Sequence, residues 1–262
     1  YKTPIINLYG ICNLSIVPLR AIESDKSEMI NQVLFGEHFT ILEHTQNWSK
    51  IRLAFDNFEG WIDNKQFVKI SEDLFRNINK KDTVYVKELV DIIYNTNNEI
   101  LTLPMGAPLS LLNNNKLTIN AVDYLFEGET ISGEKGKNAI KQFAFLFLNT
   151  PFLWGGKSPF GIDCSGFTQL VYKLCGYQLF RNANEQATQG EVLSFIEESE
   201  PGDLAFFDNE DGEIIHVGII LNDYRIIHVY GKVRIDTLDH SGIFNIDLQK
   251  HTHKLRVIKK YL

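Results

Sequence analysis

One cysteine lies where a thiol can act as a nucleophile. Cys164 follows a glycine-rich segment, 154–163, and begins a stretch with the apolar spacing of a helix. The unbonded N–H groups and positive dipole end at a helix start stabilise a thiolate, which predicts a lowered pKa for the Cys164 thiol. The alternative is a small buried apolar residue, the commonest state of a thiol in proteins and the one we expect for Cys12 and Cys175.

A nucleophilic thiol needs a base and a group that orients the base, and two histidines have a suitable setting. His216 and His228 each lie in an apolar run that predicts a strand, 214–221 and 226–229. If an odd number of residues joins the strands, both rings lie on one face, with Cβ atoms about 4.5 to 8 Å apart. A two-residue turn at 223–224 would place them on opposite faces and remove His228 from the mechanism.

The alternative for both strand histidines is a core position with satisfied ring nitrogens. We predict no metal site, because no third ligand stands at a clear spacing from them. The glycines form no phosphate-binding fingerprint, so we expect no cofactor. The remaining histidines lie in polar or loop-like segments, which predicts surface positions for His38, His44, His240, His251 and His253.

The composition excludes several classes of protein. The 262 residues are 44% hydrophobic, enough for a sizeable core, which argues against disorder and fibrous architecture. The 26 basic and 33 acidic residues give a net charge of −7, which argues against a nucleic-acid or anionic-membrane partner. Three widely spaced cysteines without a CxxC pair predict no disulfide framework and indicate a cytoplasmic protein with reduced thiols. An exported form stays open as the alternative, because the sequence begins at Tyr1 and a removed signal would not be seen. No apolar run is long enough to span a bilayer as a helix.

The elements that position these residues fall into three regions, and we predict domains over 1–75, 76–132 and 133–262. Short strands separated by turn residues indicate a small β-barrel in the first region, and a similar texture indicates a second barrel in the next. Residues 77–82 suit a linker or an ordinary loop equally well. The third region reads as α+β, with helices over 136–149 and from Cys164, followed by strands over 204–207, 214–221, 226–229 and 254–258.

Five successive motifs resemble those of the NlpC/P60 cysteine peptidases. They are Trp154-Gly155-Gly156, Asp163-Cys164-Ser165-Gly166-Phe167, Pro201-Gly202-Asp203-Leu204, His216-Val217-Gly218-Ile219 and Ile227-His228. The resemblance implies a papain-like catalytic domain in which Cys164 is the nucleophile, His216 the general base and His228 the group that orients it.

With two barrels ahead of this domain, the whole chain resembles the γ-D-glutamyl-L-diamino-acid endopeptidases with bacterial SH3 domains, of the dipeptidyl-peptidase VI type. The resemblance implies action on peptidoglycan-derived peptides with a free N-terminal L-Ala. We also expect a monomer, although no sequence feature supports this expectation. Glu37 and Asp163 would pair with the substrate ammonium, although an exposed turn glutamate is the alternative for Glu37. The same resemblance assigns further substrate-binding roles to Ser165, Trp154 and Phe58.

Two positions depart from this subgroup. Phe152 and Phe58 stand where relatives commonly have tyrosine. Oxyanion stabilisation then depends more on backbone N–H groups, and the loss of one donor lowers the rate on the order of a hundredfold. Two other functions stay open at this point: a related thiol-dependent amidase or acyltransferase, and a wall-peptide-binding protein with weak or no catalysis.

Overall fold

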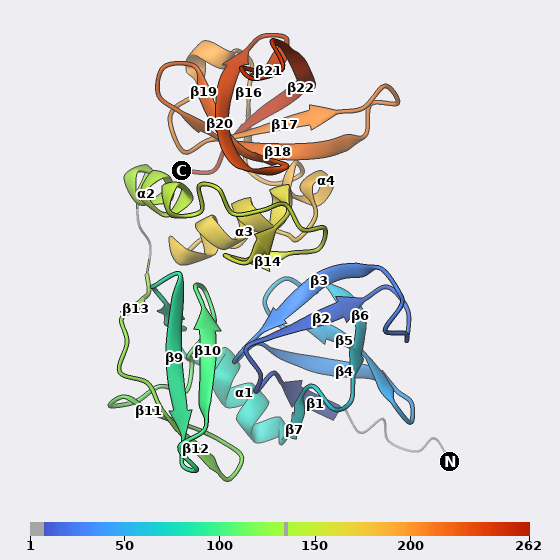
Figure 1. The fold of residues 1–262 in the computed structure, drawn as a ribbon, viewed down its shortest axis with the longest axis vertical. Helices are drawn as coiled ribbons and strands as arrows, with labels where there is room; N and C mark the ends of the chain where they lie inside the picture. Colours follow the sequence, from blue (N-terminus) through green and yellow to red (C-terminus); the bar gives the residue numbers. More distant parts are fainter. Residues whose placement is uncertain (1–7, 134–135) are drawn as a thin grey trace. The chain divides into compact units, whose positions relative to one another are not determined.

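The computed structural model describes residues 8–133 and 136–262 (Figure 1). The chain divides into two compact units, one ending at Ser132 and one beginning at Gly133. Among the described residues, no helix is long and apolar enough to cross a membrane. The two units are described in turn.

Seven strands of the first unit form one antiparallel sheet in the order β3-β2-β6-β5-β4-β1-β7. Their bounds are β1 (Leu8–Ile11), β2 (Ile16–Arg20), β3 (Met29–Leu34), β4 (His38–His44), β5 (Trp48–Leu53), β6 (Glu59–Asp63) and β7 (Val68–Ile70). Alternate residues of these strands enter an apolar core that includes Val17, Val33, Phe39 and Ile51. Of the strands predicted over 33–37, 38–42, 48–53 and 58–62, the last three are confirmed, whereas β3 ends at Leu34 and a turn follows it at Gly36.

The rest of this unit forms a four-stranded sheet, in the order β10-β9-β12-β11, and the two-stranded pair β13-β8. The bounds are β8 (Tyr85–Val86), β9 (Val90–Asn95), β10 (Ile100–Pro104), β11 (Lys116–Ile119), β12 (Val122–Leu125) and β13 (Thr130–Ile131). Leu34 and Phe35 from the first sheet pack with Ile93 and Leu103 in one core. The segments predicted as two barrels therefore share apolar packing.

A short helix, α1 (Glu72–Lys80), joins the two sets of strands. Ser71 caps it by accepting a hydrogen bond from the N–H of Leu74, and Glu72 lies in its acidic first turn. The linker or loop predicted over 77–82 is therefore mostly the end of a helix. The sequence did not predict this helix, because only Ile78 is buried in it and its sequence shows no long apolar stripe.

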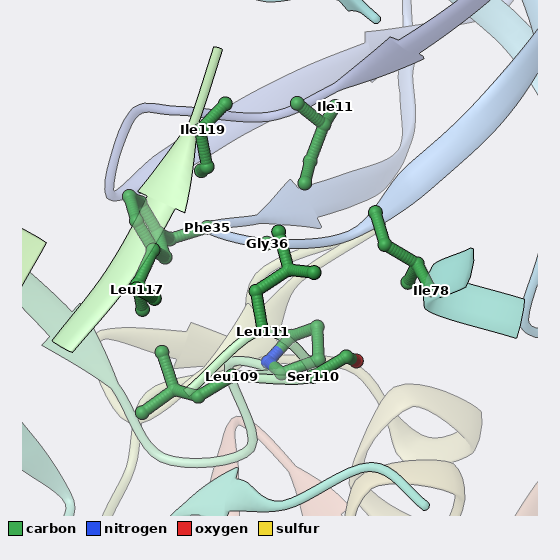
Figure 2. Close-up of a pocket in the computed structure, with 10 residues that line it drawn as sticks. Ile11, Phe35, Gly36, Ile78, Leu109, Ser110, Leu111, Leu117 and Ile119 are labelled. Atoms are coloured by element: carbon green, nitrogen blue, oxygen red, sulfur yellow. The ribbon is translucent and has the colours of Figure 1, made fainter. Parts of the chain in front are cut away.

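The first unit contains a close backbone contact beside a small cavity (Figure 2). Gly36 has a φ of +80°, and a Cβ there would lie 1.9 Å from the carbonyl oxygen of Pro108, so only glycine fits. The cavity has a volume of about 10 Å³, enough for about one water molecule. Mainly apolar side chains line it, including Ile11, Phe35, Leu117 and Ile119. We interpret it as a packing feature between the two sets of strands.

The second unit contains a closed β-barrel. Its sheet runs β16-β22-β17-β18-β19-β20-β21, and a further pairing of β21 with β22 closes the ring. The bounds are β16 (Glu191–Leu193), β17 (Leu204–Asp208), β18 (Ile214–Leu221), β19 (Arg225–Tyr230), β20 (Lys232–Asp239), β21 (Gly242–Asn245) and β22 (Lys250–Lys260). Strand β16 extends the sheet beyond β22, outside the ring of six.

Helices cover the barrel on one side, where α2 and α3 pack on each other and against β18 (Figure 1). The bounds are α2 (Lys137–Leu146), α3 (Cys164–Leu174), α4 (Ala183–Gln186) and the 3₁₀ helix η1 (Ile196–Glu198), with a hairpin of β14 (Lys157–Ser158) and β15 (Gly161–Ile162) before α3. The helix predicted from Cys164 is confirmed, and Gly176 follows it with a φ of +86°.

Strand register brings the polar residues of the barrel to its inner face. Residues directly opposite one another on paired strands point to the same side. The inner face also carries the apolar core of Ile226, Leu238 and Ile243. The pairs that place polar residues on this face are Phe207 with His216, Gly218 with His228, His228 with Arg234, Ile226 with Asp236, and Ile243 with His253. His216, His228, Arg234, Asp236 and His253 therefore lie on the inner face.

Candidate active site

The nucleophile candidate is the first residue of α3. Asp163 is the N-cap, and its Oδ1 accepts from the N–H of Gly166 at 2.7 Å while its Oδ2 accepts from the N–H of Gly155 at 2.9 Å. Gly166 is required here because a Cβ would lie 2.4 Å from the carbonyl oxygen of Gly156. These contacts fix the backbone on both sides of Cys164.

A buried arginine completes this corner of the site. Arg181 donates to both oxygens of Asp163, at 2.9 Å to Oδ1 and 2.7 Å to Oδ2, and to Oγ of Ser165 at 3.0 Å. The Arg181 side chain is 2% exposed. Such a fork-shaped pair is the usual way to hold a buried carboxylate, and it neutralises the charge next to Cys164. The sequence analysis did not identify Arg181.

The thiol itself differs from the expectation. Burial, and next the negative charge of Asp163, raise the pKa of Cys164 to about 12, although N–H groups of Val217 and Ser165 act in the opposite direction. The lowered pKa expected from the helix start is therefore wrong for this structure, because desolvation and Asp163 outweigh the helix end. The thiol is neutral at pH 7.

The two strand histidines lie side by side. Residues 222–224 form a three-residue connection, since Leu221 pairs with Arg225 and Gly218 with His228. The condition set for one shared face is met, and Nε2 of His216 lies 2.9 Å from Nδ1 of His228. Both rings are buried. Helix α3 packs against β18, and the Cys164 thiol meets the N–H of Val217, which follows His216 in the chain.

The chain of contacts continues to a carboxylate that the sequence analysis missed. Nε2 of His228 lies 3.0 Å from Oδ2 of Asp236, which is fully buried. Arg234 donates to Oδ2 at 2.7 Å and to Oδ1 at 2.9 Å, and the N–H of Ile246 donates to Oδ1 at 3.2 Å. An Asp between two β-branched residues, Ile235 and Thr237, was the available signal. The strand itself was not predicted, because its inner face carries the charged residues Arg234 and Asp236 in place of apolar ones.

Burial and hydrogen bonds set the protonation states of His216, His228 and Asp236. Burial, with smaller effects of His228 and His253, holds the pKa of His216 well below 6.5, so the ring is neutral at pH 7. Burial also lowers the pKa of His228, against the opposing effect of Asp236. Burial opposes ionisation of Asp236, but hydrogen bonds from His228 and Arg234 prevail and keep its pKa well below 3.8.

A third histidine joins the site, contrary to the surface position predicted for it. His253 is half-buried and stacks on His216, with ring centroids 4.2 Å apart and planes 25° apart. Nitrogens of His216, His228 and His253 lie within 4.8 Å of one another, so a third histidine stands beside the pair. In the stacked arrangement, however, an ion in the plane of one ring lies outside the plane of the other. Metal binding would require His253 to rotate.

The predicted substrate-binding residues are distributed over both units. Trp154 is 60% exposed in the catalytic unit, and Ser165 is buried against Arg181. In the first unit, Glu37 is buried and its Oε2 accepts from the N–H of Leu34 at 2.9 Å, so it is not an exposed turn residue. Phe58 packs against the core of that unit. The shared role of these residues in binding stays a prediction.

A cysteine at the start of a buried helix, beside a barrel that carries paired histidines, defines a papain-like cysteine peptidase domain. Comparison with known proteins gives the family: residues 149–253 match the NlpC/P60 family, and residues 19–67 match the bacterial dipeptidyl-peptidase Sh3 domain. The chain therefore contains an NlpC/P60 domain over residues 149–253 and a bacterial SH3 domain over residues 19–67.

Curated relatives match both parts of the chain. It is 29% identical over 215 residues to a gamma-D-glutamyl-L-lysine dipeptidyl-peptidase of Bacillus subtilis, covering 75% of this chain and 71% of the relative. It is 26% identical to dipeptidyl-peptidase 6 of Lysinibacillus sphaericus, covering 81% of this chain and 85% of the relative. The crystal structure of an NlpC/P60 family protein from Bacillus cereus matches with a TM-score of 0.82 and 20% identity, over 97% of this chain and 99% of that one, and shows a common fold.

Proposed function

We propose that this protein hydrolyses the γ-D-glutamyl-L-diamino-acid bond of peptidoglycan-derived peptides with a free N-terminal L-Ala, releasing L-Ala-γ-D-Glu. The observation that carries the proposal is the hydrogen-bonded pair of His216 and His228 on β18 and β19, the two strands against which the Cys164 helix packs. The substrate class is supported by the names of the relatives, which are dipeptidyl-peptidases acting on a γ-D-glutamyl-L-lysine bond or of type 6.

In this reaction the Cys164 sulfur attacks the γ-carbonyl carbon while the thiol proton passes to His216. The resulting oxyanion collapses, the C–N bond breaks, and His216 returns the proton to the leaving amine. A water molecule then gives its proton to His216 and attacks the thioester, which releases the dipeptide and restores the thiol. Phe152 has no hydroxyl to donate to the oxyanion, so backbone N–H groups near Cys164 must stabilise it.

Both reacting groups of the protein are neutral at rest. The thiol has a pKa of about 12 and the imidazole one well below 6.5, so the proton moves during attack and no thiolate–imidazolium pair exists beforehand. Activity requires neutral His216, and we expect kcat/KM to fall on acidification only well below pH 6.5. A profile of kcat/KM from pH 4 to 8 checks this, and a fall centred above pH 6.5 would contradict it.

Recognition of the free amine is assigned mainly to Glu37. The Asp163 carboxylate already accepts hydrogen bonds from Gly155, Gly166 and two nitrogens of Arg181, which occupies the approximately four acceptor positions of a carboxylate. A substrate ammonium at Asp163 would have to displace one of these donors. Trp154, Ser165 and Phe58 keep their proposed contacts with the rest of the peptide.

The direct test is to incubate the protein with L-Ala-γ-D-Glu-L-Lys and with the corresponding diaminopimelate peptide, and to detect L-Ala-γ-D-Glu by mass spectrometry. We expect Cys164→Ala to abolish the product. Cys175→Ala is the matched control, because it removes a buried thiol at the other end of the same helix. An absence of product, or equal product from Cys164→Ala, would disprove the proposal.

The saturated Asp163 favours one alternative, a thiol-dependent amidase or acyltransferase of the same fold whose substrate has no free amine. An N-acetylated peptide decides between them. A preference for the acetylated form would support the alternative. A preference for the free amine that Glu37→Gln removes would support the dipeptidyl-peptidase.

We also propose that the protein acts as a cytoplasmic monomer. The three cysteines form no disulfide, as expected where thiols are kept reduced. Cell fractionation tests the compartment, and sedimentation tests the oligomeric state.

A further inference from the structure

We propose that Asp236 is a positioning residue for the reaction: it fixes which nitrogen of each paired histidine carries a proton, so that His216 presents a lone pair to the thiol. The inference rests on the proposed roles of Cys164 and His216. Asp236 touches neither the thiol nor a substrate carbonyl. It acts through His228.

The argument starts at the buried carboxylate. An ionised carboxylate only accepts hydrogen bonds, so the His228 nitrogen that faces Asp236, Nε2, carries a proton. Neutral imidazole has one N–H, which leaves Nδ1 of His228 as an acceptor. His216 therefore donates from Nε2 across the 2.9 Å contact, and its Nδ1 holds the lone pair. The opposite arrangement would put a proton on Nδ1 of His216 and prevent it from accepting another.

Arg234 makes the fixed state of Asp236 possible. Its guanidinium binds both oxygens, and its Nη1 also pairs with Asp247 at 2.8 Å, which anchors the fork from the outside. During attack His216 becomes positively charged in a buried position. The charged and titratable groups near it are Cys164, Asp163, Arg181, His228, His253, Asp236 and Arg234. Of the two carboxylates, Asp236 is the one that hydrogen bonds connect to His216, through His228, and it can balance the new charge.

The hydrogen bonds of Asp236 also predict what an asparagine there would do. Oδ1 accepts from two groups that can only donate, Nη2 of Arg234 and the N–H of Ile246. Oδ2 accepts from one such group, Nε of Arg234, and also faces His228, which can switch between donor and acceptor. The amide oxygen of Asp236→Asn is therefore expected at the Oδ1 position, with its NH₂ directed at His228. This forces the proton of His228 to Nδ1 and that of His216 to Nδ1 as well.

Asp239 provides a matched control on the same strand. Its Oδ2 lies 2.8 Å from Nε2 of His251, so Asp239→Asn changes a second aspartate–histidine contact of the same kind. Both residues of that contact are exposed. Asp239→Asn therefore tests the chemistry of an Asp-to-Asn change on β20 without the buried relay.

The experiment has two arms. In the kinetic arm we expect Asp236→Asn to lower kcat about 100-fold with KM changed less than about threefold. That is a smaller loss than the ~10⁴-fold known where such an aspartate contacts the base directly, because His228 intervenes. Asp239→Asn should retain full activity. Equal kcat for Asp236→Asn and the unchanged protein would overturn the proposal.

The spectroscopic arm does not depend on turnover. ¹⁵N NMR of histidine side chains in Cys164→Ser should show protons on Nε2 of both His216 and His228, and adding Asp236→Asn should move both to Nδ1. Protonation of His228 at Nδ1 in Cys164→Ser overturns the proposal even if Asp236→Asn does not fold. If the predicted tautomers are found but no peptide is cleaved, the proposed substrate fails and the role of Asp236 stands.

Discussion

The catalytic unit contains two buried aspartate–arginine pairs, and their partners differ. At the nucleophile, Asp163 binds Arg181 and two backbone N–H groups. In the barrel, Asp236 binds Arg234, one backbone N–H group and an imidazole. Backbone N–H groups keep their protons, whereas an imidazole can move one. The Asp163–Arg181 pair therefore holds the backbone around Cys164 in place, whereas the Asp236–Arg234 pair controls the protonation of the histidines.

The two pairs also differ in access to water. The Arg181 side chain is 2% exposed, whereas that of Arg234 is 16% exposed and also reaches Asp247 at the surface. Loss of Arg181 leaves a buried carboxylate with no counter-charge. Loss of Arg234 leaves Asp236 with His228 and a backbone donor, and opens a route for water.

The largest expected effect is on stability. We expect Arg181→Met to lower the free energy of unfolding by about 3–5 kcal/mol, because an uncompensated charge stays buried. Arg234→Met should cost about 1–3 kcal/mol, since its partner keeps other hydrogen bonds. Urea unfolding measures both, with the exposed Arg225→Met as a control expected within about 0.5 kcal/mol of the unchanged protein. Equal losses at the two pairs would remove the distinction between them.

The second effect is on thiol reactivity. Asp163 raises the pKa of Cys164, so Asp163→Asn, which keeps the cap acceptor, should lower that pKa and increase the thiolate fraction. We expect alkylation by iodoacetamide at pH 8 to become about tenfold faster, a change of about one pKa unit. Asp239→Asn, an Asp-to-Asn change at an exposed position of β20, should leave the rate within about twofold. A similar acceleration by Asp239→Asn would show that the effect does not come from the charge of Asp163.

The smallest effect concerns His253. The folded protein holds its pKa at about 4, chiefly through burial, below the 6.5 of an unperturbed histidine. The unfolded chain therefore takes up the extra proton as pH falls from 6.5 to 4, and stability is lost over that window. His253→Phe keeps the stacking on His216 and removes the titration. Its melting temperature should fall several degrees less between pH 7 and pH 4 than that of the unchanged protein. The control is His240→Phe at an exposed position. The melting temperature of this variant should fall between pH 7 and pH 4 by as much as that of the unchanged protein.

Elements with a clear apolar period were predictable. Helix α3 and strands β18 and β19 consist mostly of buried apolar residues. Their apolar runs are visible in the sequence, so the secondary structure that carries Cys164, His216 and His228 was predictable from it. Strand β20 was missed because Arg234 and Asp236 occupy inner positions that the pattern rule reserves for apolar residues.

The remaining site residues depend on contacts between distant segments. Arg181 meets Asp163 across 18 residues, and His253 reaches His216 through the pairing of β22 with β17 and β21. Local propensity contains no information on such contacts. The thiol pKa was misjudged for the same reason, since burial by the surrounding fold outweighed the effect of the helix end.

Closure of the barrel by β22 has a consequence for biosynthesis. This strand pairs with β16, β17 and β21, so the ring cannot close until residues 250–260 have been synthesised. The nucleophile and its helix emerge from the ribosome about ninety residues earlier. The nascent chain therefore carries the Cys164 segment beside an open sheet, and the ring of strands around the histidines closes only in the last step of folding.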